Sequence, residues 1–329
     1  MSDKLRGLVI RGSRNIMTVR IDSEGGQTEL ECRIKGKVLK GQENLYNPIA
    51  PGDWVVVERE PNSSAAMILS VEERKNIFSR FNQKGSASQL LAANVDLALC
   101  VCTPSSPPFR PRFLDRVLLQ ADIAGIDSIV ICNKIDIEYD DIDVDERLEE
   151  YCRIGYKVLY VSAKTGEGIS ELRKEIAGKT CVLSGQSGVG KSSIINALQP
   201  GLDIREGELN EKYDRGVHTT TMSIMFELTD GTKIIDTPGV RRFIPDGIQS
   251  SEVISYLREF APLAGKCSFG MSCSHKTAPT AERAGASEGS RAVRGCKIME
   301  AVHAGIIHED RYDSFLRICD DLDGKENDD

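Results

Sequence analysis

Gly185-Gln186-Ser187-Gly188-Val189-Gly190-Lys191-Ser192 matches the pattern G-x-x-x-x-G-K-[ST] of a phosphate-binding loop. Residues 180–184 before it predict a short buried strand, and residues 193–198 after it predict a helix. The glycines allow successive backbone N–H groups to point at phosphate oxygens, and the helix N-terminus adds the positive end of its dipole. Lys191 is expected to contact the β- and γ-phosphates, and Ser192 to hold Mg²⁺. Because a chance glycine-rich turn would lack this strand and helix, the segment predicts a site for a nucleoside triphosphate.

A second motif, Asn133-Lys134-Ile135-Asp136, follows a predicted strand over residues 126–132. Asp136 can accept hydrogen bonds from N1–H and N2–H₂ of guanine together, and adenine offers no such pair of donors. Asn133 is expected to hold the base and the loop, and the Lys134 stem to cover the ring face. Alone, this pattern often marks only a turn. However, another predicted strand ends in Ser162-Ala163-Lys164, and ligands bind at such strand ends, so the pair predicts GTP rather than ATP.

A third motif, Asp236-Thr237-Pro238-Gly239, ends a predicted strand with the pattern D-x-x-G. Asp236 is expected to organise Mg²⁺, and the Gly239 N–H to bond the γ-phosphate. Val240, not glutamine, follows the motif, so we expect slow intrinsic hydrolysis.

The segment Gly216-Val217-His218-Thr219-Thr220-Thr221 is interpreted as a switch loop. One of its threonines, assigned here as Thr220 although the sequence does not distinguish the three, is expected to complete the metal shell. His218 either orients the attacking water or has a structural role in the loop. The residues assigned to the nucleotide and its Mg²⁺ are Asn133, Lys134, Asp136, Ser162, Ala163, Lys164, Gly185, Gln186, Ser187, Gly188, Val189, Gly190, Lys191, Ser192, Ser193, Thr220, Asp236 and Gly239, with Lys191, Asp236 and His218 assigned to catalysis.

The order of the motifs differs from that of ordinary GTPases, in which the phosphate-binding loop comes first. Here Asn133 and Ser162 precede Gly185, so we expect a circularly permuted GTPase domain. The loops still meet at one sheet edge, and the permutation places the Asp236 loop next to the segment that follows the domain.

The first 75 residues predict a small barrel of the OB type. Five apolar segments separated by glycine or proline turns predict its strands, at residues 8–10, 16–21, 30–34, 53–58 and 66–71. Few aromatic side chains argue against a base-stacking platform. The basic side chains of the first half are either a solvated strand face or a contact surface for the backbone of structured RNA: Arg6, Arg11, Arg14, Arg20, Arg33, Lys35, Lys37 and Lys40.

The 329 residues allow a multidomain protein: an OB-type β-barrel (1–75), a circularly permuted α/β P-loop GTPase domain (76–247) and a zinc-binding module with C-terminal helices (248–329). A strand over 93–102 and a helix from Pro111 to about Gly125 are expected at the start of the second unit. The net charge of −8 disfavours broad non-specific nucleic-acid binding. No secretory or membrane-spanning apolar run is present, so a cytoplasmic protein without membrane contact is expected. The chain is also expected to be a monomer.

The third unit contains Cys267, Cys273 and His275, followed by Cys296. Three thiolates and one imidazole predict a closed tetrahedral zinc site of structural type, with one Zn²⁺ per chain. The alternative is a set of scattered buried cysteines, and His303 and His308 are competing ligands. Four other cysteines lie in apolar strand-like runs and are expected to pack as small hydrophobic residues: Cys100, Cys102, Cys132 and Cys181.

The order of barrel, permuted GTPase and Cys/His module resembles the bacterial ribosome small-subunit-dependent GTPase family (RsgA/YjeQ). Further shared stretches are Cys32-Arg33-Ile34-Lys35-Gly36-Lys37, Ala93-Asn94-Val95-Asp96 and Arg311-Tyr312. The resemblance implies a GTPase that acts late in maturation of the small ribosomal subunit, is stimulated by that subunit, and contacts ribosomal RNA through the barrel and the zinc module. It also implies that Lys191, Ser192, Asp236, Asn133 and Asp136 hold GTP or GDP with Mg²⁺. Twenty residues, 276–295, separate His275 from Cys296 where the family has only a few, so they are interpreted as an inserted loop.

Three alternatives stay open at this point. A permuted assembly factor for the large subunit is disfavoured by the barrel and the Cys/His module. A metabolic P-loop kinase is disfavoured by the two guanine motifs. A zinc-dependent RNA-binding protein that uses GTP only as a structural ligand would differ in having no turnover stimulated by the subunit.

Overall fold

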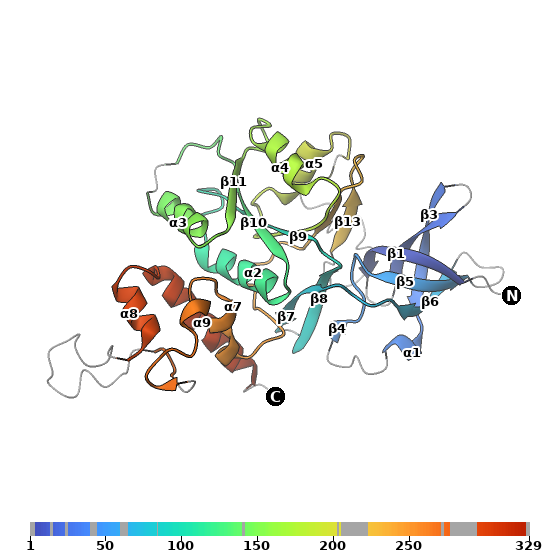
Figure 1. The fold of residues 1–329 in the computed structure, drawn as a ribbon. Coiled ribbons are helices and arrows are strands. Elements are labelled where there is room, and N and C mark those ends of the chain that lie inside the picture. Colours follow the sequence, from blue (N-terminus) through green and yellow to red (C-terminus); the bar gives the residue numbers. More distant parts are fainter. Residues whose placement is uncertain are drawn as a thin grey trace.

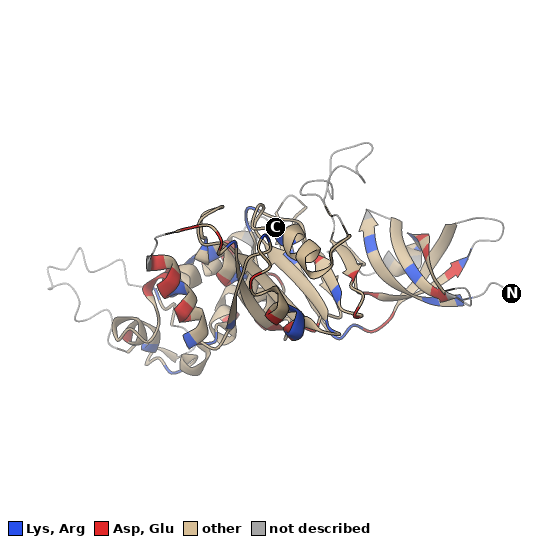
Figure 2. Cartoon of the chain, turned by 90° about the horizontal axis from the view of Figure 1, so that it is seen from above, with Lys and Arg blue, Asp and Glu red and all other residues tan. Residues whose placement is uncertain are grey.

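The computed structural model describes residues 4–13, 16–23, 26–39, 45–59, 65–83, 85–139, 142–202, 204, 223–270, 273–276 and 295–326. Figure 1 shows an elongated arrangement in which a barrel, an α/β domain and a helical module follow one another in space. The same order appears from above in Figure 2, where acidic and basic residues are interspersed along the chain.

The N-terminal barrel consists of β1 (Lys4–Ser13), β2 (Ile16–Ser23), β3 (Gly26–Ile34), β6 (Ala65–Val71) and β5 (Trp54–Arg59), in that spatial order. A second pairing of β1, with β5, closes the sheet on itself. Alternate residues of β5 and β6 face inward and pack with Val9, Met17 and Val19 in one apolar core. The five expected strands and the closed barrel are confirmed. The short helix α1 (Gly36–Leu39) follows β3.

A small sheet lies between the barrel and the α/β domain. It contains β4 (Leu45–Asn47), β8 (Ala87–Ala93) and β7 (Ile77–Asn82) in that order. The expected single strand over 93–102 is wrong, because β8 ends at Ala93 and β9 (Leu97–Cys102) begins only after a bend. Asn94 adopts a φ of 56° there, and its side chain bonds the Lys75 N–H and the Gly52 carbonyl. These local bonds replace the ladder that a continuous strand would need.

The α/β domain contains a sheet in the order β11 (Lys157–Val161), β10 (Asp127–Asn133), β9, β12 (Thr180–Gly185), β14 (Lys233–Asp236) and β13 (Ile224–Glu227). The first five strands are parallel, and β13 is antiparallel to β14. β13 also pairs with β1, which joins this sheet to the barrel. Because the parallel strands run the same way, the loops that leave their carboxyl ends meet at one edge.

Helices cover both faces of this sheet. One core contains residues of α2 (Pro111–Ile123) and α3 (Ile142–Arg153), and the other contains residues of α4 (Ile169–Ile176) and α5 (Lys191–Leu198). α2 begins at Pro111 and ends before Gly125, as predicted. Cys100, Cys102, Cys132 and Cys181 are buried in these cores, also as predicted.

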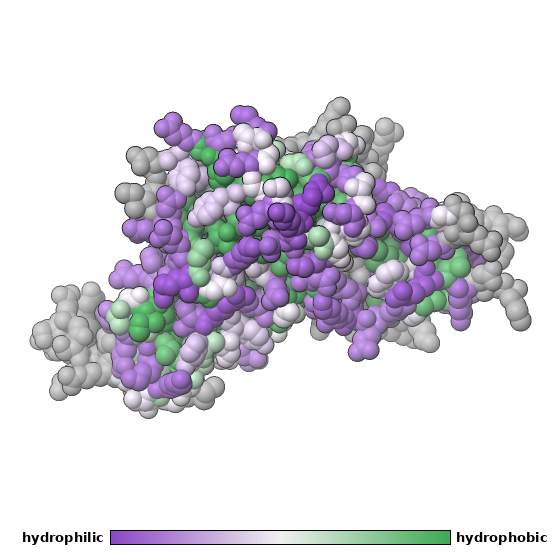
Figure 3. All heavy atoms as spheres, turned by 45° about the horizontal axis from the view of Figure 1, so that its top comes forward, coloured by the Kyte–Doolittle hydropathy of each residue, from purple (hydrophilic) through white to green (hydrophobic). Residues whose placement is uncertain are grey.

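The C-terminal module contains η1 (Ser250–Glu252), α7 (Val253–Tyr256), η2 (Ala261–Leu263), α8 (Lys297–His303) and α9 (Glu309–Glu326). Its apolar core includes Phe260 and Phe315, and Leu119 of α2 packs into the same core. The module is therefore packed directly against α2 of the α/β domain. Hydrophilic side chains predominate on the face of the molecule shown in Figure 3. Among the described helices, none has both the length and the apolar character that a membrane crossing requires.

Candidate functional site

The phosphate-binding loop lies between the end of β12 at Gly185 and the start of α5 at Lys191. Gly188 and Gly190 have φ values of 83° and 90°, which side chains with a Cβ rarely adopt. A Cβ at Gly190 would lie 2.4 Å from Asn133 Nδ2. Lys191 Nζ donates to the carbonyls of Gly185 (3.1 Å) and Gln186 (3.3 Å), so its ammonium group lies over the loop. The loop thus has the form that phosphate binding requires.

Asn133, the first residue of the Asn133–Asp136 motif, contacts both the phosphate loop and the Ser162 loop. Its side-chain Nδ2 donates to the Val189 carbonyl at 2.9 Å, and its Oδ1 accepts from the Ala163 N–H at 3.1 Å. The side chain is only 1% exposed. Since buried amides need such partners, the bonds fix the phosphate loop, the Asn133 loop and the Ser162 loop relative to one another.

Asp136 is held by side chains of the Ser162-Ala163-Lys164 motif. The Ser162 hydroxyl donates to Asp136 Oδ1 at 2.7 Å, and Lys164 Nζ lies 3.7 Å from Oδ2. The Ser162 hydrogen bond, supported by Lys164, lowers the pKa of Asp136. The carboxylate is therefore ionised at neutral pH and can accept hydrogen bonds from a purine.

Lys134 has a left-handed backbone with a φ of 66°. Its Nζ donates to the carbonyls of Gly188 at 2.7 Å and Ser106 at 2.8 Å. The aliphatic stem consequently spans from the guanine motif to the phosphate loop.

Asp236 lies at the end of β14, and its carboxylate is buried. Burial raises its pKa to about 6, against the opposing effect of Lys191. Its Oδ1 has no hydrogen-bond partner among the described residues. A buried carboxylate oxygen without a partner, near a lysine and a phosphate loop, fits a divalent cation such as Mg²⁺.

Gly239 brings the third motif against the phosphate loop. A Cβ at this position would lie 2.9 Å from Ser187 Cα and 3.2 Å from Lys191 Nζ, so only glycine fits without a shift. Ser192 and Ser193 lie in the first turn of α5, beside Lys191. His218 and Thr220 fall outside the described residues. The structure therefore brings together all the assigned nucleotide-site residues that it describes.

Cys267, Cys273, His275 and Cys296 form the second cluster, with their ligand atoms all within 4.8 Å of one another. Cys267 Sγ lies 3.6 Å from His275 Nδ1 and 3.9 Å from Cys296 Sγ, and Cys296 Sγ also lies 3.6 Å from His275 Nδ1. A tetrahedron with Zn–S bonds of about 2.3 Å and a Zn–N bond of about 2.0 Å has edges of roughly 3.5–3.8 Å. The four side chains therefore fit Zn²⁺.

The surroundings of this cluster favour the same ligand set. Burial lowers the pKa of His275, which favours the neutral imidazole that a metal needs. The Tyr312 hydroxyl donates to the His275 carbonyl at 2.6 Å. The competing ligand His308 instead accepts the Asp310 N–H at 3.2 Å, and neither His308 nor His303 belongs to the cluster.

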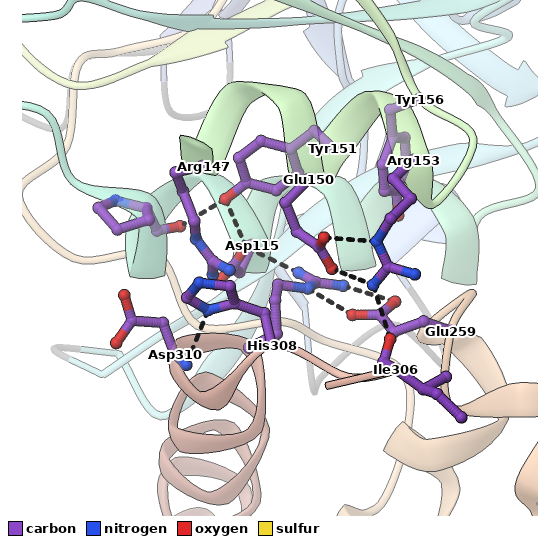
Figure 4. Close-up of polar contacts among 12 residues, drawn as sticks. Asp115, Arg147, Glu150, Tyr151, Arg153, Tyr156, Glu259, Ile306, His308 and Asp310 are labelled. Carbon is purple, nitrogen blue, oxygen red and sulfur yellow. Dashed lines mark hydrogen bonds and ion pairs between the residues drawn. The ribbon is translucent and has the colours of Figure 1, made fainter. Parts of the chain in front are cut away.

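A buried network of charges joins the C-terminal module to α2 and α3 (Figure 4). Arg311, at the start of α9, bonds Asp115 of α2 at 2.7 Å and Glu259 at 2.5 and 3.0 Å. Tyr151 and Arg147 of α3 bond the same Asp115 carboxylate at 2.6 and 3.2 Å. In the sequence, Arg311 stands out only as part of a shared stretch, because its partners lie 52 and 196 residues away.

Comparisons with known proteins agree with this architecture. The family described as RsgA GTPase matches residues 71–244. A protein of Bacteroides fragilis named small ribosomal subunit biogenesis GTPase RsgA is 35% identical over 322 residues, covering 96% of this chain and 97% of that protein. A protein of the same name from Porphyromonas gingivalis is 37% identical over 323 residues, covering 96% of each. The crystal structure of YjeQ from Thermotoga maritima is 29% identical, covers 98% of this chain and 99% of that one, and superposes with a TM-score of 0.68. The chain belongs to the RsgA GTPase family.

Proposed function

We propose that this GTPase binds the small ribosomal subunit and acts in its late maturation, in the cytoplasm and as a monomer. The observation that carries the nucleotide part is the meeting of three separate motifs around the amide of Asn133. The partner is proposed from the relatives, which are named for biogenesis of the small subunit and match nearly the whole chain.

In this proposal, the guanine base is bound by Asp136, whose ionised carboxylate is held in place by Ser162. Asn133 keeps that loop at a fixed distance from the phosphate loop, and the Lys134 stem covers the ring. Adenine would place an acceptor where Asp136 requires a donor, so ATP is rejected.

The triphosphate is proposed to lie along the loop 185–193, with Lys191 leaving its carbonyl partners to contact the β- and γ-phosphates. Ser192 and Asp236 would hold Mg²⁺, which supplies charge neutralisation during phosphoryl transfer when bound. The Gly239 N–H is assigned to the γ-phosphate. His218 and Thr220 keep their proposed roles in orienting water and completing the metal shell.

The zinc cluster is proposed to be structural, because four protein ligands leave no open position for chemistry. It would connect the 267–275 segment to the start of α8 at Cys296 across the 276–295 insertion.

Contact with ribosomal RNA is proposed for the barrel and the zinc module. Several arginines that the sequence assigned to this surface are paired within the barrel region: Arg6 with Glu72, Arg11 with Glu29, and Arg20 with Glu29 and Glu227. Arg33 and Lys35 are exposed and are the better candidates for RNA phosphates. The barrel contribution is thus expected to be smaller than the count of basic residues suggests.

The test is co-sedimentation of the full chain with purified small subunits, with large subunits as the control, at one fixed salt concentration. A GTP analogue that resists hydrolysis should bind Gly239 and favour the subunit-bound state. The chain bound to this analogue is then expected to have an affinity for small subunits about 5- to 150-fold higher than the chain bound to GDP. Equal sedimentation with both subunits would contradict the proposed partner.

A further inference from the structure

A cavity of about 470 Å³ lies beside the phosphate loop, and of its lining residues only Gln186 has a role assigned above. It is bounded by the start of α2, by the segment that follows Gly239, and by the start of α9. Its polar lining consists largely of arginine, with one residue of the phosphate loop: Arg110, Arg112, Arg116, Arg241, Arg242 and Gln186.

The acidic groups around the cavity do not balance these arginines. Arg112 pairs with Asp313, which Arg317 also contacts. Arg116 and Arg242 share a single carboxylate, that of Asp321. Asp310 is the one carboxylate in the described lining, and together with Asp313 and Asp321 it makes three carboxylates against five guanidinium groups, an excess of two positive charges among these residues.

Two arginines of the lining have donor groups available for a ligand. Arg110 and Arg241 are exposed, and neither has an ion pair or side-chain hydrogen bond within the described parts of the chain. Arg116 is about nine-tenths buried: its Nη groups donate to the Arg112 carbonyl and to Asp321, and its Nε is enclosed by protein without a partner among the described residues. Arg116 therefore contributes positive charge behind the cavity, while the exposed guanidinium groups of Arg110 and Arg241 supply the donors that an anion in the cavity could reach.

The rest of the lining suits a nucleotide unit rather than a bare ion. Phe109, Phe113 and Phe243 form an apolar wall, and the last two meet edge to face at 6.3 Å between ring centroids. A phosphate group on the arginines with a sugar or base against this wall would match both kinds of surface.

We propose that this cavity binds a phosphodiester of an RNA strand. The proposal rests on the function proposed above, because it identifies a contact through which the GTPase domain meets ribosomal RNA. Gln186 belongs to the phosphate loop, and Arg241 follows Gly239 by two residues. RNA in the cavity therefore touches both segments assigned to the γ-phosphate, which provides a route from subunit binding to GTP hydrolysis.

The first test is the double variant Arg110→Ala/Arg241→Ala, with Arg173→Ala/Lys174→Ala on α4 as a control that removes the same charge elsewhere. Binding of the full chain to small subunits is measured between about 50 and 200 mM KCl, because affinity for nucleic acid that depends on phosphate contacts falls steeply over this range. The cavity variant should bind at least about tenfold more weakly than the native chain. The slope of the logarithm of its binding constant against the logarithm of the salt concentration should fall in magnitude by about 2, one for each lost phosphate contact. The control should match the native chain. Arg110→Lys/Arg241→Lys should keep most of the slope, which separates lost charge from a folding defect.

The second test distinguishes RNA from free phosphate. With the nucleotide site saturated by a GTP analogue, inorganic phosphate should release a labelled RNA oligonucleotide more effectively than chloride at equal ionic strength. Equal subunit affinity and slope in the cavity variant and the native chain would overturn the RNA site while the proposed function stands. Failure of the native chain to bind small subunits would overturn both. Phosphate binding that is lost in the cavity variant, without any change in its RNA or subunit binding, would show a site for a free anion and also overturn the proposal.

Discussion

At the scale of single residues, Asn133 determines the geometry of the nucleotide site. One buried amide donates to the phosphate loop and accepts from the Ser162 loop, at 2.9 and 3.1 Å. The absence of a side chain at Gly190 makes room for it. Because both polar groups are satisfied by protein, these loops are positioned by the fold itself. In the proposed function, Asp136, held by Ser162, discriminates between bases.

Asp136→Asn is expected to weaken GTP binding by roughly 100-fold or more, because an amide places a donor opposite a donor of guanine. Binding of xanthosine triphosphate should improve in the same variant, since xanthine presents an acceptor there. Fluorescent-nucleotide titration measures both affinities. Asp127→Asn, at the other end of β10, is the matched control. Native-like GTP affinity in Asp136→Asn would show that the base is recognised elsewhere.

The residues proposed for the nucleotide site could be picked out of the sequence because most of them belong to motifs with fixed spacing at strand ends, which the structure brings together. The arginine cavity could not. Arg110, Arg116 and Arg241 come from separate segments, and no spacing rule links them. The ion pair between Arg20 and Glu227 could not be predicted from the sequence either, because 207 residues separate the two side chains.

At the scale of elements, α2 contacts the arginine cavity, the buried charge network and the C-terminal module. Its first turn borders the arginine cavity, its middle carries Asp115, and Leu119 packs into the core of the C-terminal module. Burial opposes ionisation of Asp115, but Arg311 and Arg147 outweigh it and lower the pKa of its carboxyl group. Asp115 is 0% and Arg311 1% exposed, so their charges depend on one another.

Asp115→Asn is expected to lower the free energy of unfolding by about 3–5 kcal/mol, because it leaves the buried Arg311 and Arg147 with too little negative charge. Denaturant unfolding followed by circular dichroism measures the change. Glu175→Gln removes an exposed partner of Lys157 and should leave the midpoint nearly unchanged. A stability of Asp115→Asn equal to that control would mean that the network does not stabilise the docked module.

The same network predicts a pH dependence. The pKa of Asp115 is lower in the folded than in the unfolded state, so its contribution is fully present above the unfolded carboxyl pKa of about 4. The contribution is lost as the pH falls through the folded value. The stability difference between the native chain and Asp115→Asn should therefore shrink on acidification below about pH 4. A difference that stays constant to the acid limit would contradict the ionised pair.

The zinc cluster joins segments that the sequence places far apart, so one Zn²⁺ per chain is expected to stabilise the module. Cys296→Ser should lose most of the metal and lower the midpoint of thermal unfolding, because three ligands hold zinc more weakly than four. Elemental analysis and a colorimetric zinc assay measure the content. Cys152→Ser, which changes an exposed cysteine, is the control. Full zinc occupancy in Cys296→Ser would remove this residue from the ligand set.

At the scale of the whole molecule, the order of the units could be predicted, but not how firmly they are joined. The alternation of apolar segments and turns predicted the barrel strands, and the order of the motifs predicted the circular permutation. The pairing of Arg11 with Ile224, which extends the α/β sheet into the barrel, leaves no local signal in the sequence. The sequence also carries no local signal for the contacts of the segment after Gly239, in which Ile244 accepts the Phe81 N–H and the Asp246 N–H donates to Gln120. In the proposed function, subunit binding and nucleotide state would communicate through this joined body.

GTP turnover by the full chain, measured with and without small ribosomal subunits at fixed salt, addresses this communication directly. Slow hydrolysis alone and a rate increased by small but not by large subunits are expected, because only the former should bind near the γ-phosphate segments. Lys191→Ala should abolish both rates and so assign them to this site. A rate in the native chain that small subunits leave unchanged would contradict a subunit-stimulated GTPase and favour GTP as a structural ligand.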